Sequence, residues 1–340
     1  MSDAQAKKTR RSRRLPVFLA GLVVLLVIGW SVLWGVGAHL IGTKFDEIIA
    51  QQAAEGTRIT CADRAIGGWP FRLDVACTPL TVERADGSRL SLPAARAVAL
   101  VYRPNHIILE ADAPAVIDPA GMTPDGRAEW TLGHASLKFS TAGLTALAAQ
   151  ATDLALSGFE PLGLRAGLKA ADVELHTRQN PGDPTRIDIA ASLAKLVDGQ
   201  RPDAPPLDID LRLTVPDPRP ARTAMPLSFT AESGTIDVVR ADVSGGDTRL
   251  GVAGTLQLDA FATPSGTLTL TVDQPDGLEA LLARLLPPQS PLVKAITGAV
   301  TGFGRKTEEA GKTRIDMPLT IRNGTVSLGL IPIGRLPRAR

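Results

Sequence analysis

Hydrophobic and polar residues alternate with a period of two along much of the chain after residue 57. In the clearest block, residues 248–259, one set of alternate positions is apolar: Leu250, Val252, Gly254, Leu256 and Leu258. A turn at residues 263–266 leads into a second run whose alternate positions are also apolar: Leu268, Leu270 and Val272. This pattern predicts an antiparallel pair of strands with one apolar face.

The end of the chain predicts a second pair of strands, over residues 317–330, with its turn at Asn323-Gly324. Asn-Gly between alternating runs is the strongest short hairpin signal. With Arg322 opposite Thr325, the predicted cross-strand partners are Ile321 with Val326, Leu319 with Leu328, and Met317 with Leu330. All three pairs fall on one face, so register and burial agree.

Similar runs bring the total to about a dozen strands. They cover residues 88–102, 107–111, 134–140, 168–177, 186–196, 207–215, 227–231 and 235–243. Helical spacing is limited to a few segments, such as residues 277–286, ended by Pro287-Pro288, and a following helix capped by Ser290. The predicted fold is mainly β: a curved antiparallel sheet or sandwich with a few short amphipathic helices.

The amino-terminal segment predicts a membrane anchor. Residues 16–37 are uncharged and measure about 33 Å as a helix, enough for a bilayer core of about 30 Å. Six Lys and Arg lie within residues 1–14, so the positive-inside rule predicts a cytoplasmic amino terminus. Trp30 and Trp34 are placed to anchor the far end of the span at the interface. A signal peptide cleaved near residues 36–38 is the alternative.

This anchor divides the chain into four parts and predicts its location. Residues 1–14 form a cytoplasmic tail, residues 15–38 the transmembrane signal-anchor helix, residues 39–56 a juxtamembrane helix and residues 57–340 a periplasmic β-rich domain. The juxtamembrane helix is either a plain stalk or a helix that packs on one end of the domain. The expected location is therefore the inner membrane, with one span and most of the chain in the periplasm.

Cys61 and Cys77 are the only cysteines, and both follow the predicted span, where an oxidising compartment permits a disulfide. Two extended runs surround the motif Gly68-Trp69-Pro70-Phe71, and each cysteine lies eight residues from Trp69. A hairpin centred there would place the two thiols opposite each other. We expect a structural disulfide and a buried hairpin end, with an exposed docking tip as the alternative use of the motif.

Charge and motifs argue against several functions. The tail carries a net +5, so residues 15–340 sum to −3, which removes the electrostatic case for nucleic acid. His39, His106, His134 and His176 lie far apart, with no spacing typical of a metal site, and no nucleophile elbow occurs. We therefore expect no catalytic residues, no metal and no cofactor, and a protein that is not an enzyme.

Two motifs carry a resemblance to a known family: residues 68–75, which lead into Cys77, and residues 322–334. With the preceding span, they resemble the family called domain of unknown function 2125 (DUF2125), single-pass envelope proteins of Gram-negative bacteria with no established activity. The ending is also similar to the wider AsmA-like group. That likeness implies an inner-membrane anchor holding a curved sheet whose apolar concave face holds lipid tails, and it supplies no catalytic residues.

The leading hypothesis is a membrane-tethered protein that binds or passes lipid along an apolar sheet groove. Its ligand would be a phospholipid or another lipid. The expected groove lining is Leu250, Val252, Leu256, Leu258, Leu268, Leu270, Val272, Leu319, Ile321, Val326 and Leu328. The alternative is a structural scaffold of envelope assembly, with a filled core and a protein partner, because a closed sandwich shows the same alternation.

Overall fold

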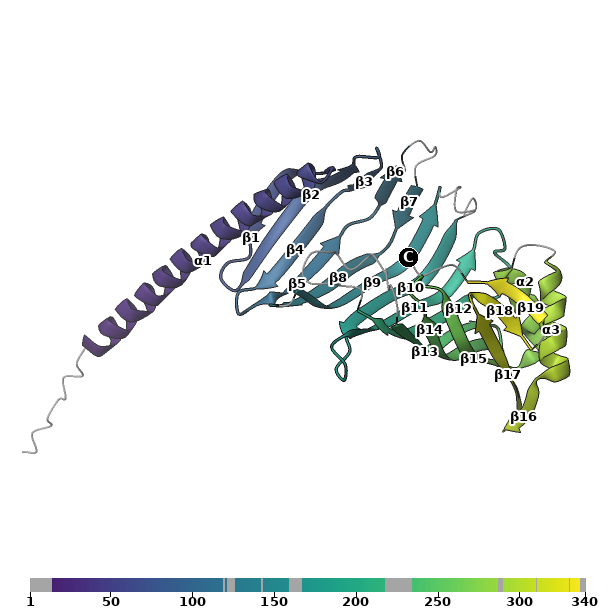
Figure 1. Ribbon diagram of the computed structural model, residues 1–340. Helices are drawn as coiled ribbons and strands as arrows, with labels where there is room; N and C mark the ends of the chain where they lie inside the picture. Colours follow the sequence, from purple (N-terminus) through teal and green to yellow (C-terminus); the bar gives the residue numbers. More distant parts are fainter. Residues whose placement is uncertain are drawn as a thin grey trace, which may run out of the picture.

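The computed structural model describes residues 14–118, 120, 126–141, 143–158, 167–217, 234–286, 290–309, 311–329 and 331–336. The long helix α1 (Arg14–Ala54) leads into a large twisted sheet, and the short helices lie at the far end of that sheet (Figure 1). These are η2 (Pro275–Gly277), α2 (Leu278–Leu285) and α3 (Pro291–Phe303).

All strands within the described residues belong to one antiparallel sheet. The first nine are β1 (Thr57–Gly67), β2 (Arg72–Arg84), β3 (Arg89–Leu92), β4 (Ala95–Leu100), β5 (Arg103–Ala111), β6 (Ala115–Asp118), β7 (Gly126–Glu129), β8 (Leu132–Ser140) and β9 (Gly143–Ser157). The others are β10 (Leu168–Gln179), β11 (Arg186–Asp198), β12 (Leu207–Pro216), β13 (Gly234–Gly245), β14 (Thr248–Leu258), β15 (Pro264–Asp273), β16 (Arg305–Glu309), β17 (Lys312–Arg322), β18 (Thr325–Leu328) and β19 (Ile331–Arg335).

The pairing runs across the sheet from the amino-terminal to the carboxy-terminal strands. One path is β1, β2, β4, β5, β8 and β9, and a second path, β3, β6 and β7, leaves β2 and rejoins at β9. From β9 each strand pairs with the next in sequence as far as β15, which pairs with β17. The sheet is therefore mainly a meander of antiparallel neighbours.

A line of interruptions bends this sheet. Pro79 separates the part of β2 that pairs with β4 from the part that pairs with β3, and Pro93 and Pro114 separate β3 from β4 and β5 from β6. Further along, Asp153 in β9 and Lys195 in β11 have positive φ: the ladder of β9 with β10 skips Asp153, and the register of β11 with β12 shifts at Lys195. Proline cannot donate to the ladder, and bulges bend a strand. Aligned breaks of this kind curve the sheet.

The helix α1 begins free and ends packed on the sheet. Residues 16–30 are exposed, whereas from Ser31 on a stripe of half-buried residues recurs at helical spacing. This stripe contacts β1: Gly42 approaches Ile66, and Arg64 pairs with Asp46 (Nη1 to Oδ1, 2.5 Å) and lies over the Phe45 ring. The juxtamembrane helix thus continues the predicted span without a break and packs on the domain.

The main hydrophobic core lies at the carboxy-terminal end, where α2 and α3 cover one face of the sheet. Leu278 of α2 and Val300 of α3 are fully buried, as is Val272 on β15 beneath them. Ser290 caps α3 by accepting a hydrogen bond from the Leu292 backbone N–H (3.4 Å). The two predicted amphipathic helices are confirmed, while Pro287-Pro288 lies outside the described residues.

Most predicted strands are confirmed. The Asn323-Gly324 hairpin has the predicted register at Arg322–Thr325, Ile321–Val326 and Leu319–Leu328, and Leu330 lies outside the described residues. The segment 88–102 is divided into β3 and β4, residues 227–231 are not described, and the long strand β9 was not predicted. The mainly β fold with an apolar amino-terminal helix and a few short helices is confirmed.

Candidate functional site

One face of the sheet carries continuous rows of apolar side chains, because residues opposite each other in an antiparallel register point to the same side. The first apolar row crosses the sheet in order through Leu73, Ala99, Ile107, Leu137, Leu147, Thr177, Ile189, Leu213, Val238, Gly254, Leu268, Leu319 and Leu328. At a strand spacing of about 4.8 Å, these thirteen positions make a track about 58 Å long. That length exceeds the thickness of a bilayer core, about 30 Å.

The neighbouring row is apolar throughout and contains many alanines. This middle apolar row runs through Val75, Ala97, Leu109, Ala135, Ala149, Leu175, Ala191, Leu211, Ala241, Val252, Leu270 and Met317. The third apolar row is Gly133, Ala151, Val173, Leu193, Ile209, Val243, Leu250, Val272 and Ile315. Between β10 and β15, the middle row alternates at first between leucine and alanine, through Leu175, Ala191, Leu211 and Ala241.

The two ends of this apolar face are covered by helices. At the first end α1 approaches the rows, because a Cβ added at Gly37 would lie 3.9 Å from the Leu73 side chain. At the other end α2 and α3 pack over β14, β15 and β17. Between β5 and β12 no described helix packs on the apolar face, and Ala149, Leu175 and Leu211 there are half-buried.

The predicted groove residues lie together on this face, at its covered end. Nine of them are buried by α2, α3 and the neighbouring strands, with exposed fractions of 9% or less: Leu256, Leu258, Leu268, Leu270, Val272, Leu319, Ile321, Val326 and Leu328. Leu250 and Val252 are partly buried at the edge of the same core. Lipid contact at these positions stays a prediction. Their burial places the accessible part of the rows earlier in the sheet, where the sequence signal is weaker.

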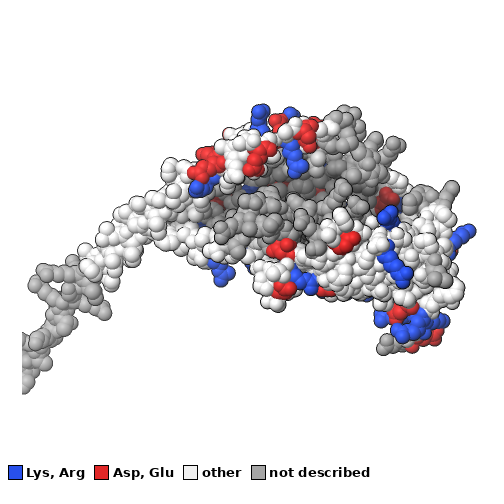
Figure 2. All heavy atoms as spheres, viewed as in Figure 1, with Lys and Arg blue, Asp and Glu red and all other residues white. Residues whose placement is uncertain are grey.

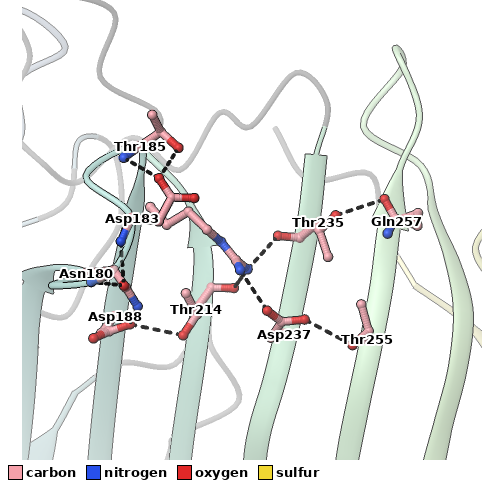
Figure 3. Close-up of polar contacts among 11 residues, drawn as sticks. Asn180, Asp183, Thr185, Asp188, Thr214, Thr235, Asp237, Thr255 and Gln257 are labelled. Carbon is pink, nitrogen blue, oxygen red and sulfur yellow. Dashed lines mark hydrogen bonds and ion pairs between the residues drawn. The ribbon is translucent and has the colours of Figure 1, made fainter.

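The opposite face of the sheet is polar. Figure 3 shows a network that runs from the β10–β11 turn to β14: Arg186 pairs with Asp237 (2.8 Å), and Thr214 donates to Asp188 (3.0 Å). Burial raises the pKa of Asp188, but hydrogen bonds from Asn180, Thr214 and Arg178 outweigh it, so the pKa lies below its usual value. Arg240 and Arg249 both pair with Asp242 further along. Because paired charged side chains recur at alternate positions of these strands, we expect this face to be solvated.

A cavity of about 580 Å³ opens mainly on this polar face. Its lining from the polar face includes Ala146, Ala148, Ala190, Lys138, His176, Arg178, Asp188 and Arg212. Leu147, Thr177, Ile189 and Leu213 of the first apolar row also contribute to the lining. His176 lies 3.3 Å from Glu174, and His106 lies 2.7 Å from the Ser136 hydroxyl. Among the described residues, no group of three or more His, Cys, Asp or Glu is placed to hold a metal ion.

The disulfide between Cys61 and Cys77 is confirmed, with the two Cα atoms 5.1 Å apart. The predicted opposition of the two thiols is wrong, because Cys61 pairs with Leu80 and Cys77 pairs with Arg64. Ala62 and Pro79 lie unpaired between these positions, and this irregularity brings the cysteines together diagonally. The bond therefore ties β1 to β2 at the line where the sheet bends.

The hairpin motif Gly68-Trp69-Pro70-Phe71 forms the turn between β1 and β2. Gly68 has φ +99°, and a Cβ there would lie 2.8 Å from the Arg72 carbonyl oxygen, so the position requires glycine. Trp69 and Phe71 are exposed rather than packed in a core, so the prediction of a buried hairpin end is wrong. The motif is too short to show a periodic pattern of apolar residues, so the sequence could not predict that its aromatic rings are exposed.

Comparison with known proteins gives one match. The model of a family described as "Uncharacterized protein conserved in bacteria (DUF2125)" matches residues 34–337, which is most of the chain. No curated protein and no solved structure matches this chain.

Proposed function

The chain belongs to the DUF2125 family, and we propose that it is an inner-membrane-anchored periplasmic protein that binds or passes lipid along the apolar rows. The observation that carries the proposal is the continuity of the middle apolar row, which crosses twelve strands without a polar side chain. Between β5 and β12 no described helix covers this row, and an apolar surface that no element covers is typical of an interaction site. Acyl chains match it in chemistry and in shape.

The anchor supports the same proposal. Within the described residues, α1 is the one helix long and apolar enough to cross a membrane, and the visible side of its free half carries no charged side chain (Figure 2). The basic residues before it favour a cytoplasmic amino terminus. The disulfide supports an oxidising compartment for the domain. The rows begin beside α1 at Leu73, next to the bilayer that would supply the lipid.

The test measures lipid carried by residues 31–340, which keep the half-buried stripe of α1, secreted and purified without detergent. Phospholipid is extracted and quantified per mole of protein. Two variants of adjacent alanines in β9 form a matched pair: Ala149→Asp puts a carboxylate on the middle apolar row, and Ala148→Asp puts one in the polar-face cavity. An ionised carboxylate among acyl chains is strongly unfavourable.

We expect stoichiometric lipid on the wild type and on Ala148→Asp, and at least about a tenfold loss on Ala149→Asp. Retention of the disulfide and of the β-sheet circular dichroism shows that each variant is folded. Lipid lost only from Ala148→Asp would assign binding to the polar-face cavity instead. Lipid-free wild type would favour the scaffold role and direct the search to a protein partner.

A further inference from the structure

An exposed aromatic cluster lies at the edge of the sheet next to the free half of α1. It consists of Trp69 and Phe71 in the β1–β2 turn and Tyr102 in the β4–β5 turn, which are 55%, 61% and 68% exposed. The Val101 backbone N–H donates to the Phe71 carbonyl oxygen (3.0 Å), so the two turns form one surface. Arg72 and Arg103, both exposed, directly follow Phe71 and Tyr102 in the sequence. We call these five residues the aromatic edge.

The aromatic edge is fixed to α1 by direct contacts. The indole N–H of Trp30 donates to the Pro70 carbonyl oxygen, and that of Trp34 donates to the Arg72 carbonyl oxygen, both at 2.8 Å. The ring centroids of Trp30 and Phe71 are 6.4 Å apart. Figure 1 shows β1 running back along α1 toward the free half of the helix. The height of the edge relative to a membrane is therefore set by Trp30 and Trp34.

The length of the free helix brings this edge to the bilayer. Residues 16–30 are exposed, with only Trp30 in contact with the aromatic edge, and measure about 22 Å at about 1.5 Å per residue, whereas the hydrocarbon core is about 30 Å thick. Arg13 and Arg14 mark the start of the span in the sequence. The remaining 8 Å or so must come from the turns of α1 that already touch the domain. Tilting the helix increases this shortfall.

We propose that the aromatic edge docks into the headgroup and upper acyl region of the leaflet on the domain side, where it holds β2 and the start of the apolar rows at the membrane surface. Aromatic rings with a polar group favour this zone, and guanidinium groups pair with headgroup phosphates. The occupant is the phospholipid bilayer that α1 crosses. The inference rests on the anchor part of the proposed function and is independent of lipid binding by the rows.

Fluorescence quenching of the full-length chain in liposomes of phosphatidylethanolamine and phosphatidylglycerol tests this docking. Among the described residues both cysteines are in the disulfide, so an added cysteine can be labelled selectively in the oxidised protein. Labels are placed by Phe71→Cys and Tyr102→Cys in the aromatic edge. Phe261→Cys, in the β14–β15 turn, is the matched control because Phe261 is also exposed (74%), and Leu25→Cys reports the anchor.

At positions 71 and 102 we expect quenching by lipids with a nitroxide near the headgroup to be about five times stronger than at position 261, with protection from aqueous iodide. Position 25 should respond to a nitroxide deep in the acyl region. Lipid quenching at 25 together with full iodide access at both 71 and 102 would overturn the docking and leave the anchor intact. Absence of lipid quenching at 25 would overturn the anchor and the docking together. The second label position excludes a local effect of removing the Phe71 ring from Trp30.

Discussion

Replacement of Leu278 by alanine tests whether α2 is a permanent cover of the carboxy-terminal end of the apolar face. Leu278 is fully buried, in the cluster that includes Val272, Val300 and Ile315. Deleting a buried leucine side chain to alanine costs about 2–5 kcal/mol, and more where the surroundings cannot collapse into the cavity. The β-strands beneath and α3 beside the site limit such a collapse, so we expect a loss of about 3–4 kcal/mol.

Leu285→Ala is the matched control, because it makes the same change at the other end of α2, where the leucine is 40% exposed. Urea unfolding of the full chain in a mild detergent, followed by circular dichroism, gives the free energy of unfolding for each variant. We expect Leu285→Ala to cost less than about 1 kcal/mol. Equal losses for both variants, or a loss below about 1 kcal/mol for Leu278→Ala, would refute the packing of α2 on the sheet.

Three further predictions concern single features of the domain. Replacing both Cys61 and Cys77 by serine should lower the free energy of unfolding, measured by urea unfolding, by about 3 kcal/mol. Reductant should then have no effect on the melting temperature of this variant. An unchanged free energy of unfolding would contradict the disulfide. Because its pKa in the folded protein is lowered, the Asp188 carboxylate stabilises the fold above about pH 3.8 and loses this effect as the pH falls through the lower native pKa. Asp188→Asn should therefore lose less stability on acidification than the wild type. Identical pH profiles of stability for the two proteins would contradict the network in Figure 3. Within α3, Gly298→Ala should stabilise the protein by up to about 1 kcal/mol, because nothing lies within 4 Å of the new Cβ. Just after α3, Gly304→Ala should destabilise it, because the new Cβ would lie 2.2 Å from the Ile315 side chain. Changes in melting temperature of the same sign for both variants would contradict the placement of α3.

The parts of the fold that could be predicted from the sequence are those set by local patterns. Alternation of period two identified β14 and β15, and Asn323-Gly324 fixed the register of β17 with β18. In each case one signal decides both the turn and the buried face, so no knowledge of distant residues is needed.

The long strand β9 was missed because its residues carry little strand signal of their own. It is rich in alanine, which is a weak strand former, and it shows no regular alternation of large apolar and polar side chains. Its extended form comes from its partners, since β8 and β10 pair with it on both sides. Pairing with neighbours overrides local preference here, as is common in sheets.

The sequence predicted which side of the strands is apolar, but not which part of that face the helices leave uncovered. Residues such as Leu256 and Val272 belong to the apolar face, yet the sequence does not show that α2 and α3 cover them. The continuity of the middle apolar row depends on the register of every strand pair, including shifts at bulges such as the one after Leu193. Each shift is a property of two strands together, so alternation within one strand cannot place it.

The central claim is that lipid lies on the apolar rows in the cell, and site-specific photo-crosslinking on the full chain tests it most directly. A photoreactive amino acid is placed in turn at Leu147 and Ala149 on the apolar face, and at Ala146 and Ala148 on the polar face of the same strand. Adducts are identified by mass spectrometry, with Leu25 in the anchor as the positive control. The account predicts phospholipid adducts at 147 and 149 and none at 146 and 148. Adducts at 25 alone, or at all four β9 positions equally, would contradict it.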